Sequence, residues 1–269
     1  MPPFMIPSRF RLCEMFGIPL YLDISLVVLL VMFVTGGGSF ASGLASALLL
    51  LISITAHEFG HSLTARAFGY ETRDITLSLL GGCASLIALP RKPSQEFLTA
   101  VAGPLVSFAL SFFGIVAISL LAAEGGIVDA FLFVWKMIWC SFGINVNTSF
   151  NLAYEASREW LMSMAIYLAI MNGVLGFFNL VPGFPLDGGR VFRSAMTPFL
   201  TRVRATYIAM VVGRGVAILV GLSGVWRMFN GRNWGFVSLL IAWMIWREGY
   251  REYQLAVMES SWRYSDWRE

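Results

Sequence analysis

Residues 42–65 read SGLASALLLLISITAHEFGHSLTA, an apolar run that contains His57, Glu58 and His61. The run is long enough for a helix that crosses a lipid bilayer, which takes roughly 20 mostly apolar residues. An ionisable residue inside such a helix costs of order 2.5–3.5 kcal/mol on insertion scales, so this cluster needs a compensating partner. A bound metal ion would supply one, and these are the only two histidines in the chain.

The rest of the 269-residue chain shares this apolar character. It is 57% hydrophobic and 13% charged, whereas an ordinary soluble domain has about 25% charged residues. This composition excludes a soluble domain and also a disordered chain, which low hydrophobicity keeps from collapsing. The net charge of +3 is too small to indicate nucleic acid as a partner. The sequence therefore predicts an integral membrane protein, with the lipid bilayer as its surroundings.

The apolar runs predict an all-α polytopic membrane protein of about six transmembrane helices with a small membrane-associated β region. The expected spans are residues 24–40, 42–65, 97–122, 160–181, 206–228 and 234–246. Most Arg and Lys residues then follow alternate spans on one side, which places both termini in the cytoplasm. The short chain without appended domains favours a prokaryotic plasma membrane. If residues 127–146 crossed alone, this asymmetry would largely vanish. That run is therefore interpreted as re-entrant, interfacial or external.

Domain organisation is expected to be simple, with residues 1–269 forming one transmembrane domain. Its core would lie at about 17–250, with an insertion at about 125–159 between the third and fourth helices. Residues 71–90 alternate apolar and polar side chains on either side of Gly81 and Gly82, which is typical of a short strand pair. Residues 9–23 also alternate, which favours an extended or interfacial segment.

The histidines belong to an H-E-x-x-H pattern. Positions i and i+4 share one face of a helix, so both imidazoles can reach one Zn²⁺ while Glu58 contacts a water on the metal. Zinc lowers the pKa of such a water from about 15.7 to about 7, and a carboxylate can then take its proton during peptide hydrolysis. The alternative is that the three side chains merely hydrogen-bond within a helix. Chance would place this pattern in roughly one such chain in a thousand, which favours a metal site.

A carboxylate is the expected third ligand. Catalytic zinc usually has three protein ligands and an open fourth position, and the chain has no third histidine, while Cys13, Cys83 and Cys140 are distant in sequence. Asp187 is the candidate because it lies in NLVPGFPLDGG, residues 179–189, where prolines and glycines make a continuous helix improbable. Unwound backbone at membrane depth is tolerated only where it is buried or lines a wet cavity.

Three motifs carry a family resemblance: HEFGH, Ala102-Gly103-Pro104 and NLVPGFPLDGG, together with GGCA at 81–84. On these motifs the chain, over about residues 17–216, resembles the site-2 proteases, membrane-embedded zinc metalloproteases. The resemblance implies that His57, His61 and Asp187 bind one zinc ion and that Glu58 is the general base. It also implies that Asn179 hydrogen-bonds the substrate backbone or the developing oxyanion.

Two departures from the family pattern are visible. Asp23 stands where many members have a histidine, and Ser107 stands where many have an asparagine; neither position is expected to be essential. Neither a PDZ insertion nor a CBS domain is expected, since no segment of suitable length is present. The resemblance implies an intramembrane endopeptidase whose partner is a membrane-bound regulatory protein, such as a tethered transcription factor, a sigma-factor precursor or an anti-sigma factor.

The strand region offers a place for the substrate. An extended peptide can add to an exposed strand edge, and Gly81 and Gly82 would let its backbone approach closely; a simple covering role for these strands is the alternative. Two other functions remain open. One is an inactive zinc-binding scaffold, against which the retained Glu58 argues, and the other is a metal transporter, for which two histidines are too few.

Overall fold

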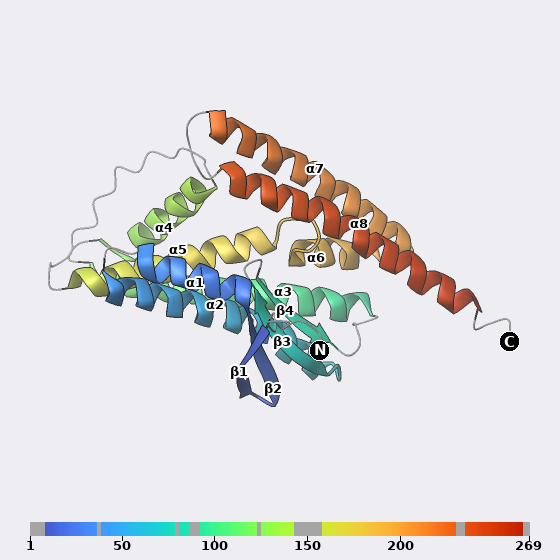
Figure 1. The fold of residues 1–269 in the computed structure, drawn as a ribbon, viewed down its shortest axis with the longest axis horizontal. Coiled ribbons are helices and arrows are strands. Elements are labelled where there is room, and N and C mark those ends of the chain that lie inside the picture. The colour runs from blue at the N-terminus through green and yellow to red at the C-terminus, as the bar shows by residue number, and fades with distance from the viewer. Residues whose placement is uncertain are drawn as a thin grey trace, which may run out of the picture. The chain divides into compact units, whose positions relative to one another are not determined.

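A computed structural model describes residues 9–36, 39–78, 81–86, 92–122, 125–142, 158–229 and 235–265, with backbone alone at 81–86. The chain divides into two compact units. The first comprises Met1–Leu89 and Ala102–Phe177, and the second comprises Pro90–Val101 and Phe178–Glu269. Figure 1 shows the helices and strands that make up these units.

Helices dominate the described residues. They are α1 (Ile24–Gly36), α2 (Phe40–Ala67), α3 (Pro93–Leu121), α4 (Ile127–Ser141), α5 (Glu159–Asn179), α6 (Asp187–Met196), α7 (Arg202–Phe229) and α8 (Gly235–Ser265). Four of these, α2, α3, α5 and α7, are long and apolar enough to cross a membrane, and each coincides with an expected span.

The expectation of six spans is not confirmed by the remaining helices. The apolar helix α1 has 13 residues, which correspond to about 20 Å of helix against a hydrocarbon core of about 30 Å. The helix α8 has 31 residues, but its apolar part ends near Trp246 and the helix then continues through charged sequence. The structure therefore supports an integral membrane protein with four candidate spans among its described helices.

The predicted strand pair is present and belongs to a larger sheet. The strands β1 (Arg9–Met15), β2 (Ile18–Asp23), β3 (Thr72–Ser78) and β4 (Gly81–Leu86) form a four-stranded sheet in that order. β2 and β3 pair in parallel, and the two outer pairs are antiparallel. Phe16 and Gly17 turn the chain between β1 and β2 with φ angles of 54° and 75°, as a tight hairpin requires.

Alternate residues of the central strands bury the sheet against the helices. Ile18, Leu20, Ile75 and Leu77 lie in one hydrophobic core with residues of α1 and α2, among them Ile54. This core lies along α2 close before His57, so burial of the sheet also fixes the part of α2 that carries the histidines.

The helix α4 packs within the first unit. Val134 and Ile138 are buried in one cluster with Ile118 of α3 and Met162 of α5. The 15 residues of α4 correspond to about 22 Å of helix, too short to cross the hydrocarbon core alone. This agrees with the interpretation of the run at 127–146 as something other than an independent span, although residues 143–146 lie outside the described residues.

Polar contacts join the long helices of the first unit. The Asn172 side-chain amide of α5 donates to Ser53 Oγ of α2 at 2.9 Å, in a position with no exposed surface. The Ser111 hydroxyl of α3 donates to the Ala169 carbonyl of α5 at 2.7 Å. Such interhelical hydrogen bonds hold helices together where lipid offers no hydrophobic driving force between them.

Asp23 caps the first helix. Its Oδ1 accepts hydrogen bonds from the Ser25 backbone amide at 2.9 Å and from the Ser25 hydroxyl. The Ser25 hydroxyl, and then the Ser25 amide, lower the pKa of the Asp23 carboxyl below its usual value. A carboxylate near a helix start satisfies amides that have no partner within the helix. Asp23 therefore has a structural role at the start of α1.

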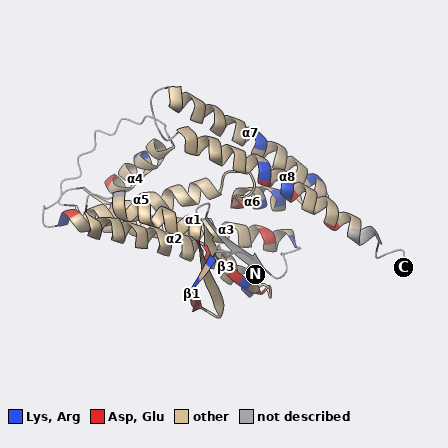
Figure 2. Ribbon diagram, in the orientation of Figure 1, with Lys and Arg blue, Asp and Glu red and all other residues tan. Residues whose placement is uncertain are grey.

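The second unit contains the predicted break in the helix. The helix α5 ends at Asn179 and α6 begins at Asp187, so residues 180–186 form the expected non-helical link. In the same unit α7 and α8 lie side by side. Figure 2 shows charged residues gathered on α6 and on the neighbouring parts of α7 and α8.

Candidate metal centre

The helix α2 brings the two imidazoles together as the spacing predicts. His57 and His61 are 3% and 8% exposed, and their Nε2 atoms lie 3.2 Å apart. Two nitrogen ligands at 2.0–2.1 Å from a tetrahedral zinc ion would be separated by about 3.3 Å. The pair therefore has the separation of two ligands of one metal ion.

A hydroxyl on α3 orients the first of these rings. His57 Nδ1 lies 2.9 Å from Ser107 Oγ, and Ser107 has no exposed surface. When Nδ1–H donates to this oxygen, the Nε2 lone pair points toward His61, which is the arrangement that a metal ligand needs. Ser107 is thus a hydrogen-bond partner of one histidine of the pair, and whether this position is inessential, as expected from the sequence, can be tested.

Gly103 makes room for the pair. A side-chain carbon at this position would meet His61 Nε2 and Cε1, and would come within 2.8 Å of His57 Nε2. Gly60 of α2 faces the same helix, because a carbon there would lie 2.8 Å from the Ala102 carbonyl oxygen. Small residues let two membrane helices approach closely, and here the approach places α3 directly against the ring nitrogens.

Sequence reasoning did not identify Ser107 or Gly103 as functional residues. A signal was present, because they are four positions apart in α3, just as the histidines are four positions apart in α2. This spacing places both residues on one helix face. The pattern predicts a face for α3 but not the helix that it meets, so the pairing becomes visible only in the fold.

Glu58 and Asp187 are also buried, at 6% and 8% exposed. Glu58 follows His57 on α2 in the first unit. Asp187 is the first residue of α6 in the second unit, where the positive end of the helix dipole favours a carboxylate. His57 and His61 in the first unit and Asp187 in the second each offer an atom of a kind that binds a metal ion.

The two glycines after Asp187 explain the local conformation of its segment. A side-chain carbon at Gly188 would meet the backbone oxygens of Val181 and Leu180, and one at Gly189 would lie 2.8 Å from the Phe184 nitrogen. The first turn of α6 therefore packs directly against the non-helical link that precedes it. This close backbone approach requires glycine at both positions.

The other predicted site residues lie at the ends of elements. Asn179 is the last residue of α5 and is half-buried. Gly81 and Gly82 open β4, where they pair with Ser78 and Leu77 of β3. The roles of these three residues in substrate binding stay predictions.

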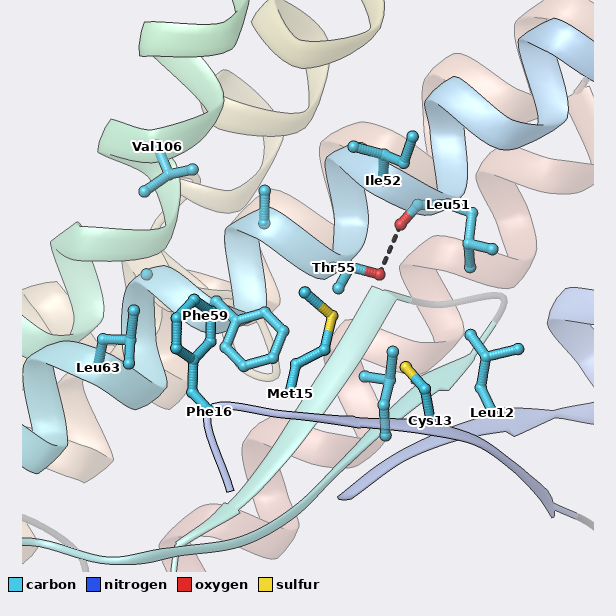
Figure 3. A pocket seen from close by; sticks show the side chains of 13 residues that line it. Leu12, Cys13, Met15, Phe16, Leu51, Ile52, Thr55, Phe59, Leu63 and Val106 are labelled. Atoms are coloured by element: carbon cyan, nitrogen blue, oxygen red, sulfur yellow. Dashed lines mark hydrogen bonds between the residues drawn. The ribbon is translucent and has the colours of Figure 1, made fainter. Parts of the chain in front are cut away.

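A cavity of about 490 Å³ lies beside α2 on the side away from the histidines. Figure 3 shows Phe16 of the β1–β2 turn and Phe59 of α2 facing each other in it, with ring centroids 5.4 Å apart. Its lining is apolar, and the Thr55 hydroxyl donates to the Leu51 carbonyl at 2.7 Å. The cavity therefore offers apolar contact rather than hydrolytic chemistry.

The Ser107 contact leads to a prediction. Ser107→Ala should weaken zinc binding about 10- to 100-fold, the usual effect of removing a hydrogen-bond partner of a metal-ligating histidine. Chelator competition on the purified protein measures this affinity. Ser111→Ala is the matched control, because Ser111 lies one turn further along α3 and its hydroxyl bonds Ala169 instead. Equal zinc affinities in the two variants would contradict the role of Ser107.

Apolar spanning helices, a histidine pair with metal-ligand spacing and a broken helix carrying an acid define a membrane protein of the metallopeptidase class. The sequence matches the family model for Peptidase family M50 over residues 45–222, and the chain therefore belongs to this family. The fold agrees: the solved structure of a site-2 protease from Methanocaldococcus jannaschii matches with a TM-score of 0.58 and 25% identity, over 91% of this chain and 95% of that one.

Proteins with similar sequences include zinc metalloproteases. The zinc metalloprotease MJ0392 of Methanocaldococcus jannaschii is 32% identical over 221 residues, which is 81% of this chain and 54% of that protein. The protein sll0528 of Synechocystis sp. is 32% identical over 256 residues, covering 88% of this chain and 58% of that protein. The chain thus spans about half the length of the curated relatives it matches.

Proposed function

We propose that this protein is an intramembrane zinc endopeptidase that cleaves transmembrane or membrane-associated regulatory proteins. The observation that carries the proposal is the buried histidine pair, with ring nitrogens 3.2 Å apart and a glycine where a side chain would overlap them. A family of zinc peptidases and a relative named as a zinc metalloprotease support zinc as the metal.

The residues would divide the chemistry between them. His57, His61 and Asp187 hold one zinc ion per chain, which when bound supplies a Lewis acid and an acidified water. Glu58 accepts a proton as the peptide carbonyl is attacked and returns it to the leaving amine, which is general acid–base catalysis. Asn179 hydrogen-bonds the substrate backbone or the developing oxyanion.

The proposed topology completes this arrangement. Six helices cross the membrane, both termini are cytoplasmic, and residues 1–269 form one protease domain. This topology is supported by the Lys and Arg residues that follow alternate apolar runs, because an excess of Lys and Arg marks cytoplasmic loops. In this topology α2 and α5 cross the membrane in the same direction. The histidines near the end of α2 and Asp187 after the end of α5 would then lie at a similar depth in the membrane.

The substrate would bind as an extended strand. A transmembrane helix has its carbonyls hydrogen-bonded internally, so a cleavable segment must unwind and find new partners. The strand β4 pairs with β3 along one edge, and among the described strands it is at the end of the sheet order. Its other edge can accept a substrate strand, with Gly81 and Gly82 allowing close backbone approach.

Gly82→Val tests this binding mode. The added side chain should reduce cleavage, with Gly82→Ala giving a smaller reduction, because each added group holds the substrate backbone further from the strand. Zinc content should stay at one ion per chain in both variants. Cleavage assays and metal analysis of the same samples provide the measurement, and cleavage by Gly82→Val at the parent rate would contradict strand addition at this position.

The function itself is tested by zinc content and cleavage together. The purified parent should hold one zinc ion per chain and cleave a co-expressed membrane-bound regulatory substrate. His57→Ala should lose both properties, and Asp187→Asn should bind zinc more weakly and lose cleavage. Zinc without cleavage of any candidate substrate would favour the scaffold, and zinc uptake into sealed vesicles would favour the transporter. Cleavage that survives loss of His57 would overturn the proposal.

A further inference from the structure

A cluster of buried charges lies in the second unit, outside the proposed chemistry. The Arg193 side chain of α6 is 4% exposed and the Glu96 side chain of α3 is 7% exposed. Arg193 donates through Nε to Glu96 Oε1 at 2.9 Å and through Nη2 to the same oxygen. Its Nη1 donates to Glu252 Oε2 of α8 at 3.1 Å, and Arg202 Nη1 donates to Glu96 Oε2 at 3.0 Å.

This geometry fixes α6 against α3 and α8, and it joins α7 to the same glutamate of α3. The planar guanidinium presents its donors in a rigid fork, so contacts to Glu96 and Glu252 define both the position and the orientation of Arg193. Arg202 begins α7 and contacts the second oxygen of Glu96. Two arginines and two glutamates balance in charge, which is the condition under which such groups tolerate burial.

The same guanidinium also contacts the link that precedes α6. Its carbon lies 5.0 Å from the centroid of the Phe184 ring, and Phe184 is 1% exposed. Gly189, in the first turn of α6, packs against the Phe184 backbone. Asp187 lies between Phe184 and Gly189, so the backbone on both sides of this carboxylate is held in one packed arrangement that includes Arg193.

We propose that Arg193 is a positioning residue that fixes the Asp187 carboxylate through its ion pairs with Glu96 and Glu252. The inference rests on the proposed function, in which Asp187 is a zinc ligand. The pairing with Glu96 matters because Glu96 lies on α3. The same helix continues to Gly103 and Ser107, the residues that contact the histidine pair. The ion pair thus holds α6, which carries Asp187, against the start of α3.

The test measures zinc affinity by competition with chelators of graded strength, using the full chain with Asp187 intact and with Asp187→Asn. Arg193→Gln should weaken zinc binding about 10- to 100-fold with Asp187 present, the range seen when support of a ligand is removed. It should have no further effect in the Asp187→Asn background, because the ligand that it positions is gone. Arg193→Lys, which keeps the charge but loses the fork, should show a smaller loss.

Each outcome has a definite meaning. An equal loss of affinity in both backgrounds, or no loss, overturns the positioning role while leaving the function intact. Unchanged affinity in Asp187→Asn alone overturns the ligand assignment instead. Arg251→Gln is the matched control, since Arg251 pairs with Glu248 on the exposed side of α8 and should bind zinc as the parent does. If Arg193→Gln fails to fold, Glu96→Gln tests the same pair with the same expected pattern.

Discussion

Glu58→Gln is expected to cleave substrate about 100- to 10,000-fold more slowly than the parent while holding one zinc ion per chain. Glutamine has nearly the shape of glutamate, so packing at this buried position of α2 should be preserved. Its amide cannot accept the proton that leaves the attacking water, and general acid–base catalysis contributes a factor of about 10²–10⁴. The proposed zinc ligands His57, His61 and Asp187 are untouched, so zinc content should not fall.

Metal analysis and cleavage of one membrane substrate by the same preparation measure both halves of this result. Glu248→Gln is the control, because Glu248 is a more exposed glutamate that pairs with Arg251 on α8. It should show the parent rate. A Glu58→Gln protein that holds zinc and cleaves as fast as the parent would remove Glu58 from the mechanism and leave the family membership standing.

Local patterns predicted those parts of the molecule that local physics determines. The long apolar runs at α2, α3, α5 and α7 became helices because burial of their backbone polar groups in lipid leaves few alternatives. The break between Asn179 and Asp187 followed from Pro182 and Pro185, which cannot continue a helix. The spacing of His57 and His61 fixed their shared face without reference to any other helix.

Contacts between distant segments were beyond such patterns. The alternation in residues 9–23 indicated extended chain, but the parallel pairing of β2 with β3 joins segments some 50 positions apart. Arg193 and Glu96 are separated by 97 positions, and His57 and Ser107 by 50. Neither member of such a pair shows in the sequence which partner it will meet, so the supports of the site appear only once the helices are packed.

Gly103→Ala should weaken zinc binding, and this is the second large effect that we expect. The added carbon would overlap the Nε2 and Cε1 atoms of His61 and approach His57 Nε2 to 2.8 Å. Relief of this overlap requires the imidazoles to rotate. A zinc ion held by the same Nε2 atoms would restrict that rotation. The strain therefore falls mainly on the zinc-bound state.

Overpacking of this kind costs about 1–3 kcal/mol, which corresponds to roughly a 5- to 150-fold weaker affinity for zinc. Gly215→Ala is the matched control, because Gly215 also lies within a helix, α7, and a carbon there would meet nothing within 4 Å. Alanine is favoured over glycine in a helix by up to about 1 kcal/mol, so the control should be at least as stable as the parent and bind zinc equally well. Parent-like zinc affinity in Gly103→Ala would mean that the ring nitrogens do not meet the metal where α3 lies against them.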